Sequence, residues 1–346
     1  MPHLPRTLVA SAALAAAALA GPAPAQDAEP VTLRWASFVS AQSTNNAESV
    51  PNWIAAVEEA SGGMLTVEHY PGGTLGKGPV QQLSMVENSV TDIAEVVVAY
   101  TPGRFPELSV FELPFLVENN VEAGLAAMIM YEDGVLSDFD ELMLPGIIIS
   151  GPYGISMTAP IESLADLEGK RLRAAGPIQT AMVEALGAVP VGNVPATQIA
   201  ESISRGLLDG ALMAPGNLYN FRIADAAKHH LFDLELGSVA VIFPMRRDTY
   251  EEMPAEAKAA FDEYSGRWLA KELGHGLDRQ EADAMERLMA DEEHVIHEWS
   301  EAQIAEAREL LAPVAAEWDT ENEDGVNLYE TVQAAIEEAR ADLADD

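Results

Sequence analysis

Hydrophobic positions in the first hundred residues alternate between strand-like runs and helical spacing. Strands are predicted at residues 31–36, 64–70 and 93–99. Helices are predicted around apolar residues that recur every three or four positions: Val50, Ile54 and Val57, then Val80, Leu83 and Val86. The order strand–helix–strand–helix–strand predicts an α/β architecture with a largely parallel sheet.

A second set of elements of the same kind begins near Gly146. Strands are predicted at 147–150, 170–174, 188–191 and 207–211, with helices at 178–186 and after Pro195. Two α/β units therefore follow one another, with no fixed-period repeat and no low-complexity linker between them.

The C-terminal third is predicted to be helical. One apolar stripe includes Phe261, Trp268 and Leu277, and it describes a helix of roughly 45 Å, long enough to bridge two lobes. Gly274 and Gly276 are the predicted place for a bend. Two shorter helices packed on one lobe are the alternative.

The chain is predicted to divide into two lobes. Residues 26–151 with about 240–277 are predicted to form lobe I. Residues 152–239 with about 278–346 are predicted to form lobe II.

Composition narrows the possible partners of the chain. Its 346 residues include 56 Asp and Glu against 19 Lys and Arg, a formal charge of −37. Such an acidic surface binds nucleic-acid phosphates and anionic lipid poorly, so no nucleic-acid partner is predicted. The absence of cysteine excludes disulfides, thiol nucleophiles and cysteine-ligated metals.

The N-terminus has the features of an export signal. An apolar stretch at residues 8–20 follows His3 and Arg6, and Ala23-Pro24-Ala25 supplies small residues for a signal peptidase. We predict a signal peptide at residues 1–25, cleavage near Ala25 and a periplasmic mature protein. A retained N-terminal anchor is the alternative.

Motifs for covalent chemistry are missing from the sequence. It has no G-x-S-x-G, H-E-x-x-H or G-x-G-x-x-G pattern, so we predict no catalytic residue and no cofactor. His294 and His297 lie beside two glutamates, but histidines among acids are usually a solvated face, and no metal site is predicted. An exported two-lobed α/β protein without such motifs is more naturally a binding protein, with its ligand in the cleft between the lobes.

Five sequence blocks, taken in order, resemble the solute-binding subunits of tripartite ATP-independent periplasmic (TRAP) transporters, dicarboxylate-type class. The blocks are Tyr70-Pro71-Gly72-Gly73, Phe105-Pro106-Glu107-Leu108, the decapeptide 164–173, Gly187-Ala188-Val189-Pro190, and Gly206 with Asp209-Gly210. The resemblance implies the periplasmic solute-binding protein fold, with two lobes, a ligand cleft between them and a long C-terminal helix bridging them. It further implies an extracytoplasmic receptor, not an enzyme, that delivers an organic acid to membrane permease subunits. The alternatives are an exported carboxylate-based hydrolase or lyase, and the receptor of an ATP-driven importer.

The resemblance also implies a ligand-binding arginine. Within the block 164–173 it assigns Arg173 to the ligand carboxylate, and a planar guanidinium suits a carboxylate through two parallel hydrogen bonds. Strand alternation puts Arg171 and Arg173 on the same sheet face, so spacing alone leaves open that Arg173 belongs to a charged surface patch.

Two departures from the family pattern suggest the kind of ligand. Tyr153 and Met213 stand where many members carry a basic residue and an asparagine. A phenol and a thioether make a less polar cleft, which predicts a monocarboxylate with an apolar or aromatic body. The alternative is that both are ordinary core residues.

The remaining predicted ligand-binding residues are those that the resemblance implies near the cleft: Phe38, Glu95, Tyr100, Gln198 and Asn217. Glu95 is unusual, because a carboxylate within an apolar strand needs partners. It could accept a hydrogen bond from a ligand hydroxyl or amine, or point outward.

Overall fold

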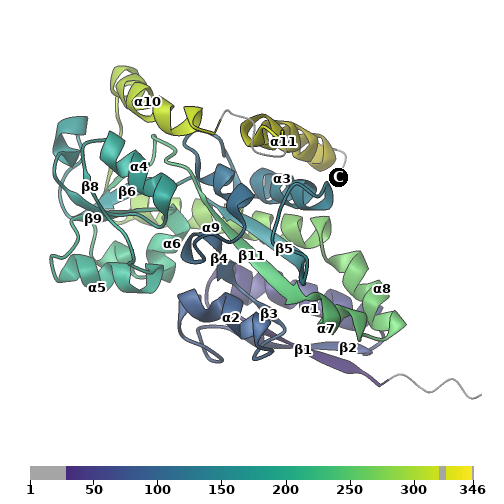
Figure 1. The fold of residues 1–346 in the computed structure, drawn as a ribbon. Helices are drawn as coiled ribbons and strands as arrows, with labels where there is room; N and C mark the ends of the chain where they lie inside the picture. The colour runs from purple at the N-terminus through teal and green to yellow at the C-terminus, as the bar shows by residue number, and fades with distance from the viewer. Residues whose placement is uncertain (1–28, 319–324, 345–346) are drawn as a thin grey trace, which may run out of the picture.

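The computed structural model describes residues 29–318 and 325–344, which form two lobes, each built on a six-stranded sheet (Figure 1). The predicted signal peptide and its cleavage site lie outside the described residues. Among the described helices, none is both long enough and apolar enough to cross a bilayer.

The first sheet runs in the order β2-β1-β3-β11-β4, with β5 also paired to β11. Its strands are β1 (Val31–Ala36), β2 (Leu65–Tyr70), β3 (Ile93–Ala94), β4 (Val96–Val97), β5 (Leu142–Ser150) and β11 (Val239–Arg246). β1 is parallel to β2 and β3, as predicted, whereas β11 is antiparallel to all of its neighbours. The sheet is therefore mixed rather than largely parallel, because β11 returns to it from the second lobe.

The predicted strand at 93–99 is interrupted at Glu95. β3 and β4 pair with β11 in one register, but the pairing is interrupted between them. The interruption lies opposite Phe243–Met245 of β11, where the pairing of β11 with β5 is also irregular. Pro244 lies in that irregularity, and proline has no N–H to donate to a neighbouring strand. After Val97 the chain enters the 3₁₀ turn η3 (Val98–Tyr100).

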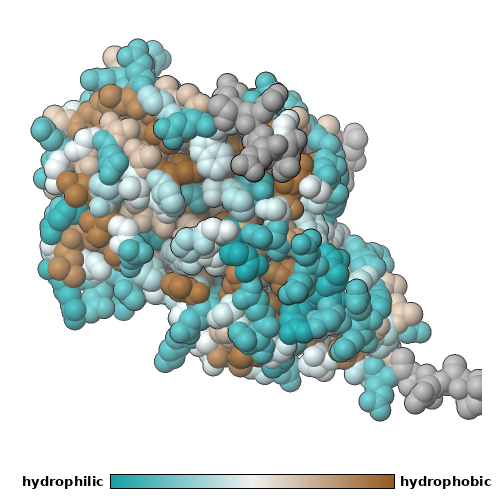
Figure 2. Space-filling view, viewed as in Figure 1, coloured by the Kyte–Doolittle hydropathy of each residue, from teal (hydrophilic) through white to brown (hydrophobic). Residues whose placement is uncertain are grey.

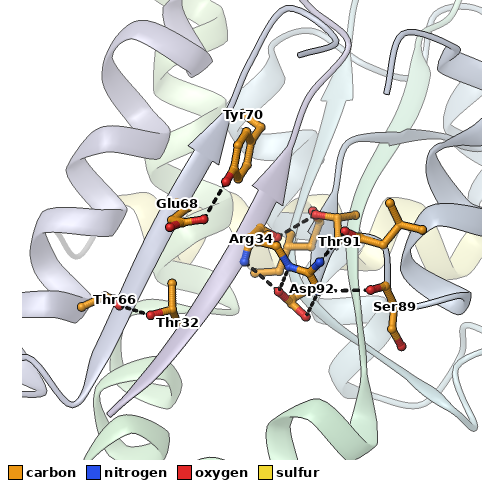
Figure 3. Close-up of polar contacts among 10 residues, drawn as sticks. Thr32, Arg34, Thr66, Glu68, Tyr70, Ser89, Thr91 and Asp92 are labelled. Atoms are coloured by element: carbon orange, nitrogen blue, oxygen red, sulfur yellow. Dashed lines mark hydrogen bonds and ion pairs between the residues drawn. The ribbon is translucent and has the colours of Figure 1, made fainter. Parts of the chain in front are cut away.

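The loop before β3 is tied to β1 by an arginine. Arg34 donates from Nε to Asp92 Oδ2 at 3.0 Å, and its backbone N–H donates to the same oxygen at 2.8 Å (Figure 3). On the neighbouring strand pair, the Thr32 and Thr66 hydroxyls are 2.7 Å apart (Figure 3). The bonds between Arg34 and Asp92 fix where β3 starts, and with it the position of Glu95.

Helices cover both faces of this sheet. They are η1 (Asn45–Ser49), α1 (Val50–Ala60), α2 (Gln82–Glu87), α3 (Asn120–Glu132), α7 (Arg247–Glu251) and α8 (Ala255–Tyr264), with the 3₁₀ turns η2 (Pro79–Gln81) and η4 (Pro106–Glu112). α3 was not predicted, because it is buried on nearly all sides and so has no polar face to set a helical period.

The second sheet runs in the order β12-β10-β6-β9-β7-β8. Its strands are β6 (Gly154–Met157), β7 (Arg171–Arg173), β8 (Val189–Val191), β9 (Gly210–Met213), β10 (His229–Leu231) and β12 (Val295–His297). α4 (Pro177–Ala185), α5 (Ile199–Ser204) and α6 (Pro215–Asn220) pack around it, with the 3₁₀ turns η5 (Leu164–Leu167), η6 (Ala196–Gln198) and η7 (Ile223–Asp225). β9 begins three residues later and ends two residues later than the strand predicted at 207–211. In Figure 2, hydrophobic residues are more frequent over this lobe than over the first.

Helix α9 (Arg267–Ala290) joins the two lobes, as predicted. It packs on α3 and β5 of the first lobe and on α6 and β12 of the second (Figure 1). The predicted bend at Gly274 and Gly276 is wrong, because the helical stripe breaks earlier, between α8 and α9 at Ser265 and Gly266. A Cβ on Gly274 would lie 2.6 Å from Val121 Cα, so this glycine allows close packing of α9 on α3.

The last two helices pack on different lobes. α10 (Glu301–Ala316) contacts α4 of lobe II, whereas α11 (Leu328–Ala344) lies along α3 of lobe I (Figure 1). Arg340 on α11 donates to Glu122 on α3 at 2.9 Å. We therefore propose that residues 328–344 belong with lobe I, in place of the predicted assignment of 278–346 wholly to lobe II.

Candidate functional site

A cavity lies between the two sheets, with about 610 Å³ of atom-free space including its mouth. Lobe I contributes residues that follow β1 and β4, and lobe II contributes residues at the ends of β7 and β9 and on α6. The predicted residues that line it are Phe38, Glu95, Tyr100, Tyr153, Arg173, Met213 and Asn217. The structure thus brings together seven predicted side chains from five separate stretches of the sequence.

Gln198 is the predicted site residue that the structure does not bring to the cavity. It is the last residue of η6 and is exposed, and it is not among the residues that line the cavity. Helix α5 buries Ile199 and Ile203 against the lobe II core, and this orientation turns Gln198 towards solvent.

Arg173 is buried, with 1% of its surface exposed, at the carboxyl end of β7. Its Nε donates to Val194 O at 3.0 Å and its Nη2 donates to Tyr100 Oη at 2.8 Å. Within the described residues it makes no ion pair, and its Nη1 makes no hydrogen bond. A buried, permanently charged group without a counter-ion favours an anion in the cavity.

Arg171 has a different environment from Arg173, although both lie on β7. Its guanidinium binds Asp209 through two hydrogen bonds, of 3.0 and 2.8 Å, and its side chain is 43% exposed. The alternation pattern could not separate these two arginines. The two arginines differ in their position along β7. Arg173 lies at the end of the strand, where it and Ala175 line the cavity, whereas Arg171 is not among the lining residues.

Two tyrosines flank the Arg173 guanidinium. Tyr100 Oη accepts from Arg173 and also from the Ala196 N–H at 2.9 Å. Burial raises the pKa of Tyr153, so this phenol stays protonated and able to donate across the physiological range.

The walls away from Arg173 are largely apolar. Phe38 of lobe I and Phe221 of lobe II lie stacked, with ring centroids 6.4 Å apart and ring planes 13° apart. Met213 is buried beside them. The remaining apolar lining residues are Val39, Val97, Ile148, Ala175, Ala196, Val239, Val241 and Leu277.

Sequence reasoning missed Phe221 and Gln280, which also line the cavity. Phe221 follows Asn217 by four residues, so helical spacing from Asn217 could have identified it. Gln280 lies on α9 and accepts from Asn220 Nδ2 at 3.0 Å. Nothing in the local sequence links it to the cleft.

Glu95 carries the one carboxyl group among the residues that line this cavity. Its Oε2 accepts a hydrogen bond from the Ser37 hydroxyl. Burial raises the pKa of Glu95 to about 7, and the Ser37 bond opposes this shift.

Two further acids have raised pKa values near the cavity. Burial raises the pKa of Glu112 to about 8, although the positive charge of Arg173 acts in the opposite direction. Burial also raises the pKa of Glu281 to about 8, while a hydrogen bond of 2.6 Å from the Gly216 N–H partly offsets the shift.

The histidines of the H-x-x-H pattern do not converge on one point. His294 Nδ1 is 2.8 Å from His230 Nε2, whereas His297 Nε2 is 3.1 Å from His229 Nδ1. In the part of the chain that the structure describes, no three His, Cys, Asp or Glu side chains are grouped to hold a metal.

Comparisons with known proteins agree with this architecture. A family model described as "Bacterial extracellular solute-binding protein, family 7" matches residues 36–321. A TRAP solute-binding protein from an unidentified marine microbe, specific for aromatic acid ligands and solved with metahydroxyphenylacetate, is 30% identical with a TM-score of 0.82. That alignment covers 89% of this chain and 99% of the other.

Two further relatives support the same similarity. A TRAP solute-binding protein of Rhodoferax ferrireducens T118, solved with copurified benzoate, is 26% identical with a TM-score of 0.81, covering 90% of this chain and 99% of that one. The uncharacterized protein YiiZ of Salmonella typhimurium is 30% identical over 188 residues, 51% of this chain and 55% of YiiZ. The match thus spans about half the length of this curated relative. The predicted resemblance and the two-lobed α/β fold class are confirmed.

Proposed function

Because the chain belongs to family 7 of the bacterial extracellular solute-binding proteins, we propose that it is the receptor of a TRAP transporter and captures an aromatic monocarboxylate. The observation that carries this proposal is the buried, unpaired guanidinium of Arg173 at one end of an otherwise largely apolar cavity. A ligand carboxylate there would meet the free Nη1 and the Tyr153 hydroxyl. An aromatic body would then fill the space near Phe38 and Phe221.

The net charge of the chain does not oppose anion capture. Surface charges more than about 8 Å away are largely screened at physiological ionic strength, whereas a buried guanidinium is not. The local chemistry of Arg173 therefore outweighs a formal charge of −37 spread over the whole chain.

The class of receptor indicates how the bound acid would be delivered to the membrane. The chain would be exported to the periplasm, with its signal peptide removed near Ala25. It would close around the acid, carry it to the membrane permease subunits and release it chemically unchanged. The family is one of receptors, which favours this function over a hydrolase or lyase.

A ligand screen tests the proposal. The purified protein is heated in the presence of benzoate, phenylacetate, succinate or galactonate, and positive acids are titrated calorimetrically. Aromatic monocarboxylates are expected to raise the melting temperature, because a ligand that binds only the folded state stabilises it. Mass spectrometry of the released acid is expected to find it unaltered. Stabilisation by succinate or galactonate alone, or turnover of the acid, would contradict the proposal.

A further inference from the structure

A chain of hydrogen-bonded side chains leads from β2 to the cavity and ends at Glu95. His69 Nε2 is 3.1 Å from Asn46 Oδ1, Asn46 Nδ2 is 3.0 Å from Ser37 Oγ, and Ser37 Oγ bonds to Glu95 Oε2. Asn46 and Ser37 are both buried. The ligand carboxylate bound at Arg173 does not require any of these side chains.

The direction of each bond in this chain is determined by its partners. Asn46 Nδ2 also lies 3.1 and 3.2 Å from the carbonyl oxygens of Val39 and Ser40, which can only accept. The amide is therefore oriented with its nitrogen towards these oxygens, and its two protons are shared among them and Ser37 Oγ. Asn46 Oδ1 can then only accept from His69. Burial lowers the pKa of His69 to about 4, so a neutral imidazole donates this bond at neutral pH.

The bond between Ser37 and Glu95 also has a defined direction. Its oxygen accepts from Asn46 Nδ2 and from the Val39 N–H at 3.1 Å, so its single proton is donated to Glu95 Oε2. Glu95 Oε1 makes no hydrogen bond within the described residues, and Glu95 lines the cavity. Ionised Glu95 therefore presents to the ligand an oriented acceptor that lacks a donor.

We propose that Glu95 selects an aromatic monocarboxylate that carries a hydroxyl group, accepting its hydrogen bond through Oε1. This inference rests on the proposed function and names the substrate class more narrowly. A site built around an acceptor rejects analogues without the donor, because the carboxylate is then left unpaired in a poorly solvated cavity. The same negative charge repels a second ligand carboxylate and so disfavours dicarboxylates.

The ionisation of Glu95 gives the hydroxyl preference a pH dependence. The other titratable groups that line the cavity are Tyr100, Tyr153 and Arg173. His69 lies at the opposite end of the hydrogen-bonded series from Glu95. Among the carboxyl groups, Glu95 is the one that both lines the cavity and titrates between pH 6 and 8. Glu112 and Glu281, whose pKa values are about 8, also begin to ionise in this interval, but neither lines the cavity. With a pKa of about 7, Glu95 gains its acceptor charge over that interval, and the preference for hydroxylated ligands should rise with pH.

Calorimetric titration of the full chain tests this inference. The ligands are benzoate, 3- and 4-hydroxybenzoate, and the matching methylbenzoates, at pH 6 and pH 8. At pH 8 at least one hydroxybenzoate is expected to bind about 10- to 100-fold tighter than its methyl isostere. The ratio is expected to shrink at pH 6. E95L should bring the ratio close to one at both pH values.

Two further variants distinguish a specific effect of Glu95 from a folding defect caused by the substitution. E112Q removes another buried carboxyl with a raised pKa that does not line the cavity, so it should leave the ratio unchanged. S37A removes the bond that lowers the Glu95 pKa, so the rise in the ratio should move to higher pH.

The outcomes separate the two proposals. Tight benzoate binding without any hydroxyl preference, or a preference that survives E95L and does not respond to S37A, would overturn the role of Glu95 alone. If no aromatic acid binds at either pH, the proposed function itself is wrong.

Discussion

Arg173 of lobe II donates a hydrogen bond of 2.8 Å to the Tyr100 hydroxyl of lobe I. The same hydroxyl accepts from the Ala196 N–H of lobe II, so one lobe I oxygen holds two lobe II groups. This arrangement both orients the guanidinium and links the lobes across the cavity.

Replacing Tyr100 with phenylalanine is expected to weaken aromatic acid binding by about 10-fold, because a hydrogen bond to a charged group is lost. Calorimetric titration measures the change. Y70F serves as the control, since the Tyr70 hydroxyl bonds to exposed Glu68 and lies outside the cavity lining. Equal affinities of Y100F and the wild type would show that the interlobe bond does not contribute to binding.

The stacked pair Phe38 and Phe221 predicts a preference for flat, aromatic ligands. In F221L the apolar bulk is kept and the ring is lost, so benzoate should bind about 3- to 10-fold more weakly. Cyclohexanecarboxylate, which cannot stack, should be little affected. F232L is a matched control, because Phe232 stacks on His230 and does not line the cavity. A similar loss for both acids would argue against stacking.

Glu112 gives the stability of the protein a pH dependence. Its pKa in the folded protein is about 8, against an ordinary value of 4.5, so the folded state binds more protons than the unfolded state between these values. The free energy of unfolding therefore falls as pH rises through this interval. The melting temperature of E112Q should fall less between pH 5 and pH 8 than that of the wild type.

A control for E112Q is available on the surface of the same lobe. Glu107 bonds to Ser137 at an exposed position, and E107Q should keep the wild-type slope of melting temperature against pH. If E112Q and E107Q both follow the wild type, Glu112 is not a buried acid with a raised pKa in solution.

Gly274 is predicted to be essential for the packing of α9 on α3. In G274A the new methyl group would meet Val121 Cα at 2.6 Å, and such overpacking costs about 1–3 kcal/mol. Denaturant unfolding measures the loss. G192A is the control, because a Cβ at Gly192 would meet no atom within 4 Å. Equal stability of the two variants would contradict the packing argument.

The sequence predicted those elements whose signal is local. The helices at Val50–Ala60 and Pro177–Ala185 and the strand at Val31–Ala36 follow from apolar periodicity and flanking turn residues. Helix α3 and strand β11 escaped prediction. α3 has no polar face, and the place of β11 in the first sheet depends on pairing with strand residues at least 89 positions away along the chain, as for Val239 and Ser150.

The candidate site was predictable to the extent that its residues lie in recognisable blocks. Arg173 stood within one, and its burial depends on the lobe I residue Tyr100, which only the fold places beside it. Phe221 and Gln280 contribute to the cavity from helices without any motif. Gln198 shows the opposite case, a residue in a family-like position that the local helix turns towards solvent.

The most direct test of the central claim compares two arginines on one strand. Benzoate affinity is measured calorimetrically for the wild type, R173A and R171A. Removing a buried, hydrogen-bonded charge partner should weaken binding by at least about 30-fold in R173A. R171A, which loses a partly exposed pair with Asp209, should bind like the wild type. Undiminished benzoate binding by R173A, with the variant folded, would contradict the claim that its guanidinium holds the ligand carboxylate.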